Sequence, residues 1–350
     1  MVADPLATHT RARVRARGVP RLWGLCSGAF LVVALLVGLG IGPVAIGPGA
    51  IVESALSHVP LVDVHTPLSS VQEAILWQLR APRIVLAALV GGMLALAGAS
   101  YQGVFRNPLA DPYLLGVAAG AGLGATVAIS YGGASERVVP VAAFAGAVVA
   151  VMAAYALGRS VGSARATGAL VLAGVTVAAF MTAIQTFVQQ EHTQTLRDVY
   201  SWLLGGFSTS SWSDVAVAAP YIGGSSLVLL LHRRVLDVLS VGDDEATSLG
   251  VDVGRVRVIV VAAATAGTAA AVAVSGLIGF VGIIVPHTIR LLVSTSYRAV
   301  VPLSLLVGGG FLVFTDVLAR TVLSPQELPI GVITAFFGAP FFALVLRGRR

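Results

Sequence analysis

The carboxylate placed well inside a long apolar stretch of this sequence is that of Asp316. An acidic side chain within the membrane is by default a candidate for proton or ion transfer. Arg320 follows at i+4, which is the spacing of an ion pair on one helix face. Because this local partner can neutralise the carboxylate, we expect Asp316 to have a structural role.

A second candidate is His287, which lies three residues before Arg290 and therefore on the same helix face. A lone histidine in a membrane could relay protons. No acidic residue lies near it in the sequence, so we favour hydrogen bonding at a helix end. Cys26 is the single cysteine, and it can form neither an intrachain disulfide nor a CxxC pair.

Several classes of enzyme lack their necessary residues. The 22 basic residues are all arginine, which excludes a Walker A loop and a lysine Schiff base, since both need lysine. No HExxH motif, Ser/Lys pair or acidic metal cluster is found in the sequence. We therefore expect a chain that is not an enzyme, with no catalytic residue, no metal site and no cofactor of its own.

The composition is that of a membrane protein. The chain is 57% hydrophobic and 11% charged, with a mean hydropathy of +0.91, whereas soluble domains carry about 25% charged residues. The apolar residues are spread along the whole length, so lipid must act as the solvent. Backbone groups in lipid must be satisfied within each segment, which predicts helices. The 40 glycines would let these helices pack closely.

Apolar stretches of about 20 residues, the length that crosses a bilayer, predict an all-α polytopic fold of about ten spans. They predict one transmembrane domain over residues 1–350, with no separate soluble domain. Residues 190–212 form an external segment, in which DVYSWLLGGFS (198–208) is expected to form a short surface helix. The approximate limits of the spans are 22–46, 81–104, 114–133, 137–158, 167–189, 213–232, 256–275, 278–294, 300–322 and 330–347.

Arginine placement predicts the orientation, because basic residues are retained on the cytoplasmic side. With both termini inside, residues 1–21 form a cytoplasmic tail and residues 233–255 a cytoplasmic loop. Spans two to five then begin outside and spans seven to ten inside, which suggests an inverted four-helix repeat. The arginines that would lie outside are Arg80, Arg83, Arg137, Arg197 and Arg320.

The loop DDEATSLGVDVGRVR (243–257) is the most informative cytoplasmic segment. Its three leading acids favour a helix N-terminus, and Gly250 is expected to end that helix. A polar helix between two spans has no role in lipid, so it would suit docking to a cytosolic partner. An ordinary solvated loop is the alternative.

The segment RNPLADPYLLG (106–116) contains two prolines and predicts a non-helical turn at the membrane edge. Gly116, Gly120 and Gly124 follow at intervals of four residues. This stripe of small residues predicts close contact with another helix.

Seven segments in this order resemble the FecCD family of permeases, which serve iron–siderophore, haem and vitamin B12 ABC importers. The resemblance runs from about residue 75 to the C-terminus. The segments are LRAPR (79–83), GMLALAGASYQGVFRNPLADPYLLG (92–116), LVLAGV (170–175), WLLGGFS (202–208), DDEATSLGV (243–251), GFVGIIVPHTIRLL (279–292) and ELPIGVITAFFGAPFF (327–342).

This resemblance implies a transport subunit in the cell (inner or plasma) membrane, with ten helices and a pathway on a dimer axis. The second subunit would be the same chain or a paralogue. Two cytosolic ATPase subunits would use ATP and Mg, and an extracytoplasmic solute-binding protein would deliver an iron–siderophore, haem or cobalamin. The implied partners include the lipid bilayer but no nucleic acid.

The resemblance also implies roles by position. Residues 243–254 would couple to the ATPase, and outer arginines would pair with acids of the binding protein, although Arg80 and Arg83 could instead be interfacial anchors. Gly168 replaces a small hydroxyl residue beside the gate position Thr167. The coupling residues are Asp243, Asp244, Glu245, Ala246, Leu249, Gly250 and Val251; the docking residues are Arg80, Arg83 and Arg320; the gate and pathway residues are Asn107, Leu109, Thr167, Thr176, Thr182 and Gln185.

Three other functions fit these residues less well. An ion-coupled secondary transporter would want several acids in mid-membrane, and only Asp316 is offered. A membrane scaffold or receptor would be compatible with the long docking loop, but less so with helices broken by Gly and Pro. An intramembrane enzyme would need one of the catalytic motifs that the sequence lacks.

Overall fold

The computed structural model describes residues 19–59, 65–132, 137–160 and 166–347, and for residues 166, 167 and 346 it describes the backbone only. Within these ranges every regular element is a helix. Seven helices are long and apolar enough to cross a membrane, and three shorter apolar helices accompany them. Together they correspond to the ten predicted spans, and the all-α polytopic class is confirmed.

The helices at the predicted spans are α1 Arg21–Gly40, α4 Ala81–Val104, α5 Val117–Gly132, α6 Val138–Ser160, α7 Ala166–Glu191, α9 Trp212–Leu239, α11 Val253–Ser275, α12 Val281–Leu292, α13 Tyr297–Thr321 and α14 Ile330–Arg347. The connecting elements are α2 Pro48–Ser57, α3 Ser70–Ala74, a π-helical turn Ile75–Arg80, a 3-10 turn Thr193–Thr195, α8 Leu196–Leu204 and α10 Asp243–Ser248. The predicted surface helix is therefore found as α8.

Several predicted limits are wrong by a few residues. The first span was predicted to end near Ile46, but α1 ends at Gly40. The sixth span was predicted to end at residue 232, but α9 continues to Leu239. The eighth was predicted over 278–294, but α12 covers only Val281–Leu292. Residues 276–280 leave the helix because Gly276 and Phe280 both adopt positive φ, at +67° each, a conformation that a helix cannot continue.

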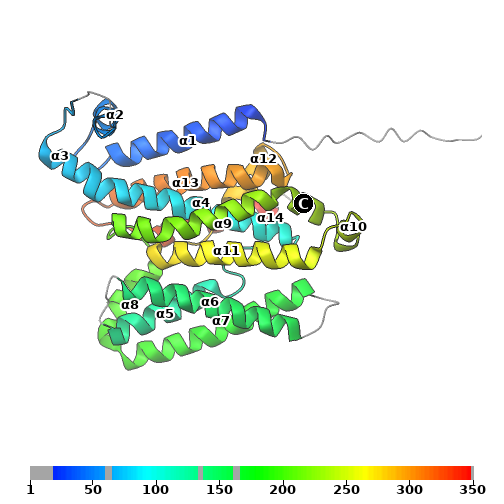
Figure 1. Ribbon diagram of the computed structural model, residues 1–350. Coiled ribbons are helices and arrows are strands. Elements are labelled where there is room, and N and C mark those ends of the chain that lie inside the picture. The colour runs from blue at the N-terminus through cyan, green and yellow to red at the C-terminus, as the bar shows by residue number, and fades with distance from the viewer. Residues whose placement is uncertain (1–18, 60–64, 133–136, 161–165, 348–350) are drawn as a thin grey trace, which may run out of the picture.

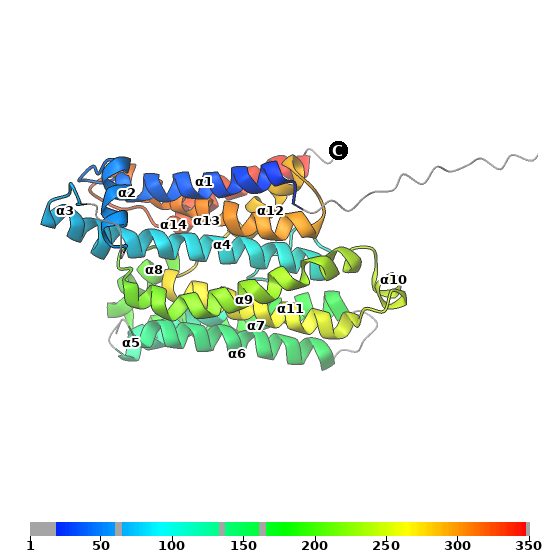
Figure 2. The same cartoon turned by 45° about the horizontal axis from the view of Figure 1, so that its top comes forward.

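The helices form one bundle with α4 at its centre, packed against α13, α9, α11 and α12 (Figure 1). Nearly all of α4 is buried. A second group, α5, α6 and α7, joins this core through α11, and α1 covers α13. Both views place α2, α3 and α8 at one end of the bundle and α10 at the other (Figure 2). We call these the α8 end and the α10 end.

Glycines permit the closest helix contacts. A Cβ built on Gly120 or Gly124 would lie 2.2 or 2.1 Å from a backbone oxygen of α6, so the predicted glycine stripe is the contact between α5 and α6. A Cβ on Gly98 of α4 would lie 2.1 Å from the Gly282 oxygen of α12. In lipid no hydrophobic effect drives helices together, and small residues at such crossings let the backbones approach closely enough for van der Waals packing to hold them.

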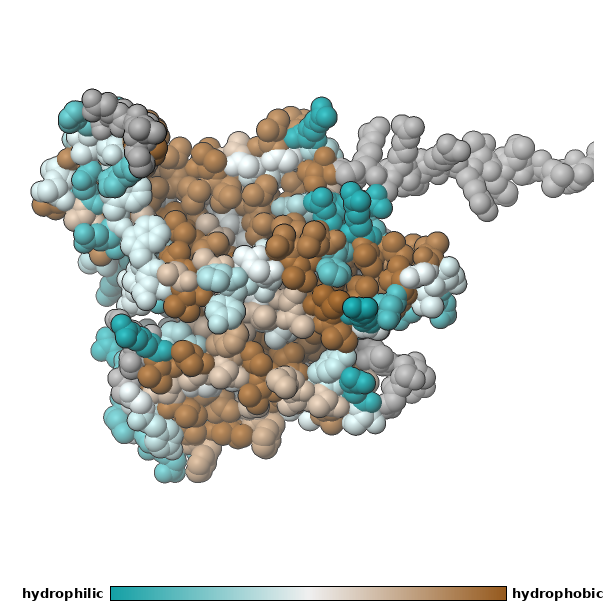
Figure 3. Space-filling model, in the orientation of Figure 1, coloured by the Kyte–Doolittle hydropathy of each residue, from teal (hydrophilic) through white to brown (hydrophobic). Residues whose placement is uncertain are grey.

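The surface agrees with a membrane setting. On the face shown in Figure 3, apolar side chains form a band across the middle of the bundle, and polar side chains gather toward its two ends. Helix α4 begins at the α8 end and α11 begins at the α10 end, so the two four-helix sets start in opposite directions, as the proposed repeat requires. Whether the two sets also share one packing, and which end faces the cytoplasm, stay predictions.

Candidate functional site

The α10 end carries a short helix that projects from the bundle (Figure 2). Its first turn holds Asp243, Asp244 and Glu245, where acids interact favourably with the helix dipole. Gly250 follows it with φ +85°, a left-handed conformation that glycine adopts without a steric penalty, and so ends the helix as predicted. Leu249 is 70% exposed.

The predicted coupling residues divide into two sets. Ala246 is fully buried, and Val251 packs against the core. Asp244, Glu245, Leu249 and Gly250 are exposed. The buried residues hold the loop on the bundle, and the exposed ones form a small apolar and acidic surface that a soluble partner could contact.

Asp243 ties α10 to two other elements. One carboxylate oxygen lies 3.2 Å from Arg257 Nη2 on α11, and the other lies 3.5 Å from Arg106 Nη2 at the end of α4. Asp243 was predicted as a helix-terminal acid and a coupling residue, and neither arginine was predicted as its partner. A signal for these contacts exists in the sequence. Arg106 opens the RNPLADP segment and was predicted to lie on the same, cytoplasmic side of the membrane as the acids at 243–245, so an ion pair between them could have been proposed.

The turn between α4 and α5 is held by its own side chains. Asn107 Oδ1 accepts from the Leu109 backbone N–H at 2.9 Å, and Asp111 Oδ1 accepts from that of Tyr113 at 2.8 Å. Asn107 and Leu109, the predicted gate residues, are both exposed. Asp111 keeps partial exposure, and burial raises the pKa of its carboxyl to about 6.

The predicted pathway residues of α7 do not share one environment. Thr176 and Thr182 are exposed on the bundle surface. Gln185 is buried, and its Oε1 lies where a Cβ on Gly122 of α5 would be, 2.9 Å away. Gln185 therefore packs inside the subunit. Thr167 lies in the first turn of α7, and its side chain is outside the described residues. The pathway role of all four stays a prediction.

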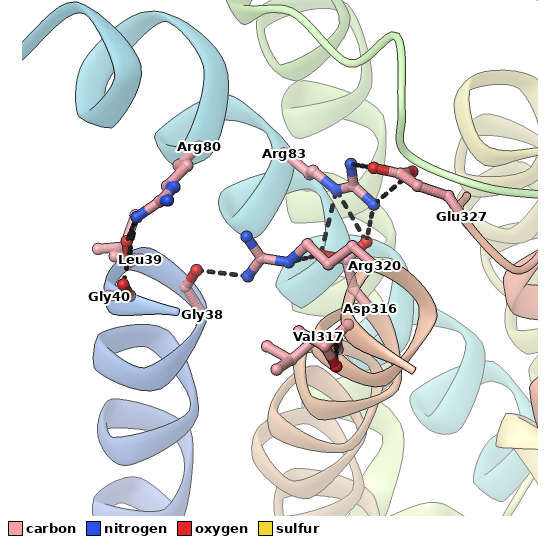
Figure 4. A network of polar contacts seen from close by, with 10 residues as sticks. Gly38, Leu39, Gly40, Arg80, Arg83, Asp316, Val317, Arg320 and Glu327 are labelled. Carbon is pink, nitrogen blue, oxygen red and sulfur yellow. Dashed lines mark hydrogen bonds and ion pairs between the residues drawn. The ribbon is translucent and has the colours of Figure 1, made fainter. Parts of the chain in front are cut away.

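The three predicted docking arginines lie together at the α8 end, where Figure 4 shows them turned toward neighbours in the same chain. Arg80, 5% exposed, donates to the carbonyl oxygens of Leu39, Gly40 and Val44. These are orphan acceptors at and beyond the end of α1. Arg80 therefore caps α1.

Arg83 and Arg320 converge on Asp316. Arg83 Nη2 lies 2.8 Å from Asp316 Oδ1, and Arg83 Nη1 lies 2.8 Å from Glu327 Oε1 (Figure 4). Arg320 Nε lies 3.4 Å from Asp316 Oδ2, and its Nη2 donates to the Gly38 carbonyl of α1. The expected local pair of Asp316 is present, and Arg83 is a second partner that the sequence did not indicate.

This network joins α1, α4, α13 and the segment before α14. The side chains of Arg83 and Arg320 are 12% and 8% exposed, so in this structure they present little charge to an external protein. Their docking role stays a prediction, whereas their contacts inside the chain are evident. The described outer arginines that are exposed and outside any ion pair of the described residues are Arg137 and Arg197.

A hollow of about 750 Å³ opens beside this network. Arg197 and Ser201 of α8, the hydroxyl-rich segment 206–210 and the Arg83–Glu327 pair lie along its walls. Within the part of the chain that the structure describes, no group of three or more His, Cys, Asp or Glu side chains could hold a metal ion. The walls of the hollow are polar, and the described residues form no metal-binding cluster there.

Comparison with known proteins agrees with this architecture. Residues 30–348 match the model of the FecCD transport family. The chain is 39% identical to the cobalamin import system permease protein BtuC of Halobacterium salinarum, over 93% of this chain and 96% of that one. It is 33% identical to the Fe(3+)-citrate import system permease protein YfmE of Bacillus subtilis, over 94% and 95% of the two chains.

A solved structure shows the same fold at similar coverage. It is an inward-facing conformation of a metal-chelate type ABC transporter, with a TM-score of 0.82 and 30% identity over 94% of this chain and 99% of that one. The resemblance inferred from the sequence motifs is thus confirmed over nearly the whole chain. The protein belongs to the FecCD transport family, a family of membrane permease subunits of ABC transporters in which ATP hydrolysis resides on a separate chain.

Proposed function

We propose that this chain is the translocating subunit of a binding-protein-dependent importer that carries an iron–siderophore, or a related metal chelate such as haem or cobalamin, into the cytoplasm. The observation that carries the proposal is α10, a polar helix between two spans of a FecCD-family bundle. The relatives named for cobalamin and for ferric citrate support the metal-chelate class.

The α10 end is the cytoplasmic end in this proposal. Exposed Leu249 and Val241, at 70% and 61%, and the acids of α10 suit the cleft of a cytosolic ATPase dimer, which would supply ATP and Mg. Basic residues favour the cytoplasmic side, and the arginines at this end include Arg106, Arg159, Arg255 and Arg257. Both termini would then lie in the cytoplasm of a cell whose inner or plasma membrane holds the protein.

The α8 end would face the external solute-binding protein, with the hollow beside α8 as the place where a loop of that protein enters. A second permease subunit, identical or paralogous, would pack against the apolar faces of α7 and α14, on which Phe187 and Phe336 are 63% and 73% exposed. Thr176 and Thr182 would line the pathway between the two subunits.

The mechanism needs no bond chemistry in this chain. ATP binding would close the ATPases and displace α10, and the rigid bundle would carry that displacement to the gate by switching between two packings. The described residues lack a metal-ligand cluster, and weak binding is what passage of a large ligand requires, since a tight site would retain it.

The test is uptake into proteoliposomes that contain this chain, its ATPase and its binding protein. Radiolabelled ferric siderophore, haem and cobalamin are compared with and without ATP, and with ionophores that collapse ion gradients. We expect accumulation of one chelate that requires ATP and survives the ionophores. Uptake that stops with the ionophores would instead support ion-coupled secondary transport. An assembled complex that accumulates none of the three would overturn the proposed cargo class.

A further inference from the structure

Two non-helical segments meet inside the bundle. One is the turn 105–116 between α4 and α5, and the other is residues 276–280 between α11 and α12. Pro112 approaches Gly282 so closely that a Cβ there would lie 2.7 Å from Pro112 Cδ and 3.0 Å from the oxygen of Leu94, in the middle of α4. Irregular backbone at such depth is stable only when protein satisfies its polar groups.

The Tyr113 side chain satisfies backbone polar groups of this irregular segment. Its hydroxyl donates to the Ile278 carbonyl oxygen at 3.0 Å and accepts from the Ile278 N–H at 3.1 Å. One side chain thus holds both backbone polar groups of a residue in the break between α11 and α12. Any displacement of the turn must either move Ile278 with it or break both hydrogen bonds.

The turn itself is stiff. Pro108 and Pro112 each fix a φ angle, and the Asn107 and Asp111 side chains close two short turns. Gln102, fully buried on α4, donates both to the Ala110 carbonyl oxygen of the turn and to that of Gly282 on α12. A segment held in this way transmits a displacement better than a flexible loop does.

The other end of the turn touches α10. Arg106, the residue that leaves α4 with a left-handed φ of 49°, contacts Asp243, the first residue of α10. One short segment therefore carries a contact to α10 at its start and the Tyr113 contact to residues 276–280 near its end.

We propose that Arg106 and Tyr113 are positioning residues that link α10 to the break between α11 and α12 through the turn 105–116. The link rests on the proposed function, since it carries the displacement that an ATPase would impose on α10. When α10 moves, Asp243 passes the displacement to Arg106. The turn 105–116 then moves as a unit, and Tyr113 shifts Ile278 and the start of α12.

The first test replaces Tyr113 by Phe, which removes only the hydroxyl. The measurement is the number of ATP molecules hydrolysed per cargo molecule taken up by the reconstituted complex. We expect this ratio to rise about fivefold, the factor that corresponds to one lost hydrogen bond. The matched control is Tyr101→Phe, which removes a buried hydroxyl that contacts Thr265 at 2.7 Å between α4 and α11, and it should leave the ratio unchanged.

The second test is a double-mutant cycle of Arg106→Ala and Asp243→Asn, with Arg159→Ala as the control for loss of an exposed arginine at the same end. If the two residues act through their contact, the double variant has the same ATP-to-cargo ratio as the worse single variant. If the ratio of the double variant instead changes by the product of the two single effects, the link is overturned. An unchanged ratio in Tyr113→Phe would overturn it as well. Uptake by the unmodified chain separates these outcomes from failure of the proposed function. If the unmodified chain takes up no cargo, both the proposed function and this link are overturned; if it does, the variants test the link alone.

Discussion

The Arg83 guanidinium lies 2.8 Å from the fully buried Asp316 carboxylate, and this contact joins α4 to α13 across the sequence. Replacing Arg83 by Met should leave that buried charge with Arg320 alone, at 3.4 Å. Breaking a buried ion pair from one side costs about 3–5 kcal/mol, and we expect the lower part of this range because one partner remains. Thermal unfolding in detergent measures the loss.

Arg197→Met is the matched control, since Arg197 is exposed at the same end and has no ion pair among the described residues. Surface substitutions of this kind change stability by about 0.5 kcal/mol or less. Equal melting temperatures for the two variants would contradict the structural role that we assign to Arg83.

A substitution of Arg80 can distinguish a role in docking from a role in folding. It is buried and caps the end of α1 through three carbonyl oxygens. Arg80→Gln should lower stability by roughly 2 kcal/mol, because hydrogen bonds from a charged donor are lost. Affinity for the solute-binding protein should change little in the folded variant. A lower affinity at an unchanged melting temperature would restore Arg80 as a docking residue.

The contrast between Asp316 and Arg83 shows what the sequence could predict. The Asp316–Arg320 pair follows from local spacing, and hydropathy is enough to find ten helices. Arg83 and Glu327 reach the same site from other elements, and no periodicity indicates which side chains such elements bring together. Residues 278–280 lie within the stretch that hydropathy predicts as the eighth span. Their departure from the helix depends on tertiary contacts, such as that of Tyr113 with Ile278.

The close crossing of α4 and α12 predicts that a glycine-to-alanine substitution changes stability very differently at different positions. A Cβ on Gly98 would lie 2.1 Å from a backbone oxygen of Gly282 and cannot be relieved by a rotamer change. Gly98→Ala should destabilise the bundle by roughly 1–3 kcal/mol or more. Gly223→Ala in α9 has no atom within 4 Å of the new Cβ, so it should be neutral or stabilising by up to about 1 kcal/mol. Similar losses for both variants would refute the close crossing.

Asp111 predicts a pH dependence of stability. Burial raises the pKa of its carboxyl to about 6 from an ordinary value near 3.8. The folded state therefore holds a proton that the unfolded state releases between about pH 4 and 6, and the stability gained from protonation is present below pH 4 and lost as the pH rises through 6.

Asp111→Asn should remove this loss, because the amide keeps the Oδ1 acceptor for Tyr113 and carries no charge. We expect the variant to match the native chain near pH 4 and to exceed its stability at pH 7.5 by up to about 3 kcal/mol. Melting temperatures measured across this range provide the check, and a difference that is constant with pH would show that Asp111 does not titrate as described.

Gly250 offers the sharpest test of the coupling surface, because a side chain there meets no steric obstacle. No atom lies within 4 Å of a Cβ at this position, yet its φ is +85°. A β-branched residue resists the left-handed conformation by roughly 1–2 kcal/mol, whereas asparagine tolerates it. Gly250→Val should therefore reorient the chain after α10 and raise the ATP hydrolysed per cargo molecule, and Gly250→Asn should have a much smaller effect. Glu245→Arg, which reverses an exposed charge of α10, should also uncouple. Normal coupling in both Gly250→Val and Glu245→Arg at native expression would mean that α10 does not receive the ATPase.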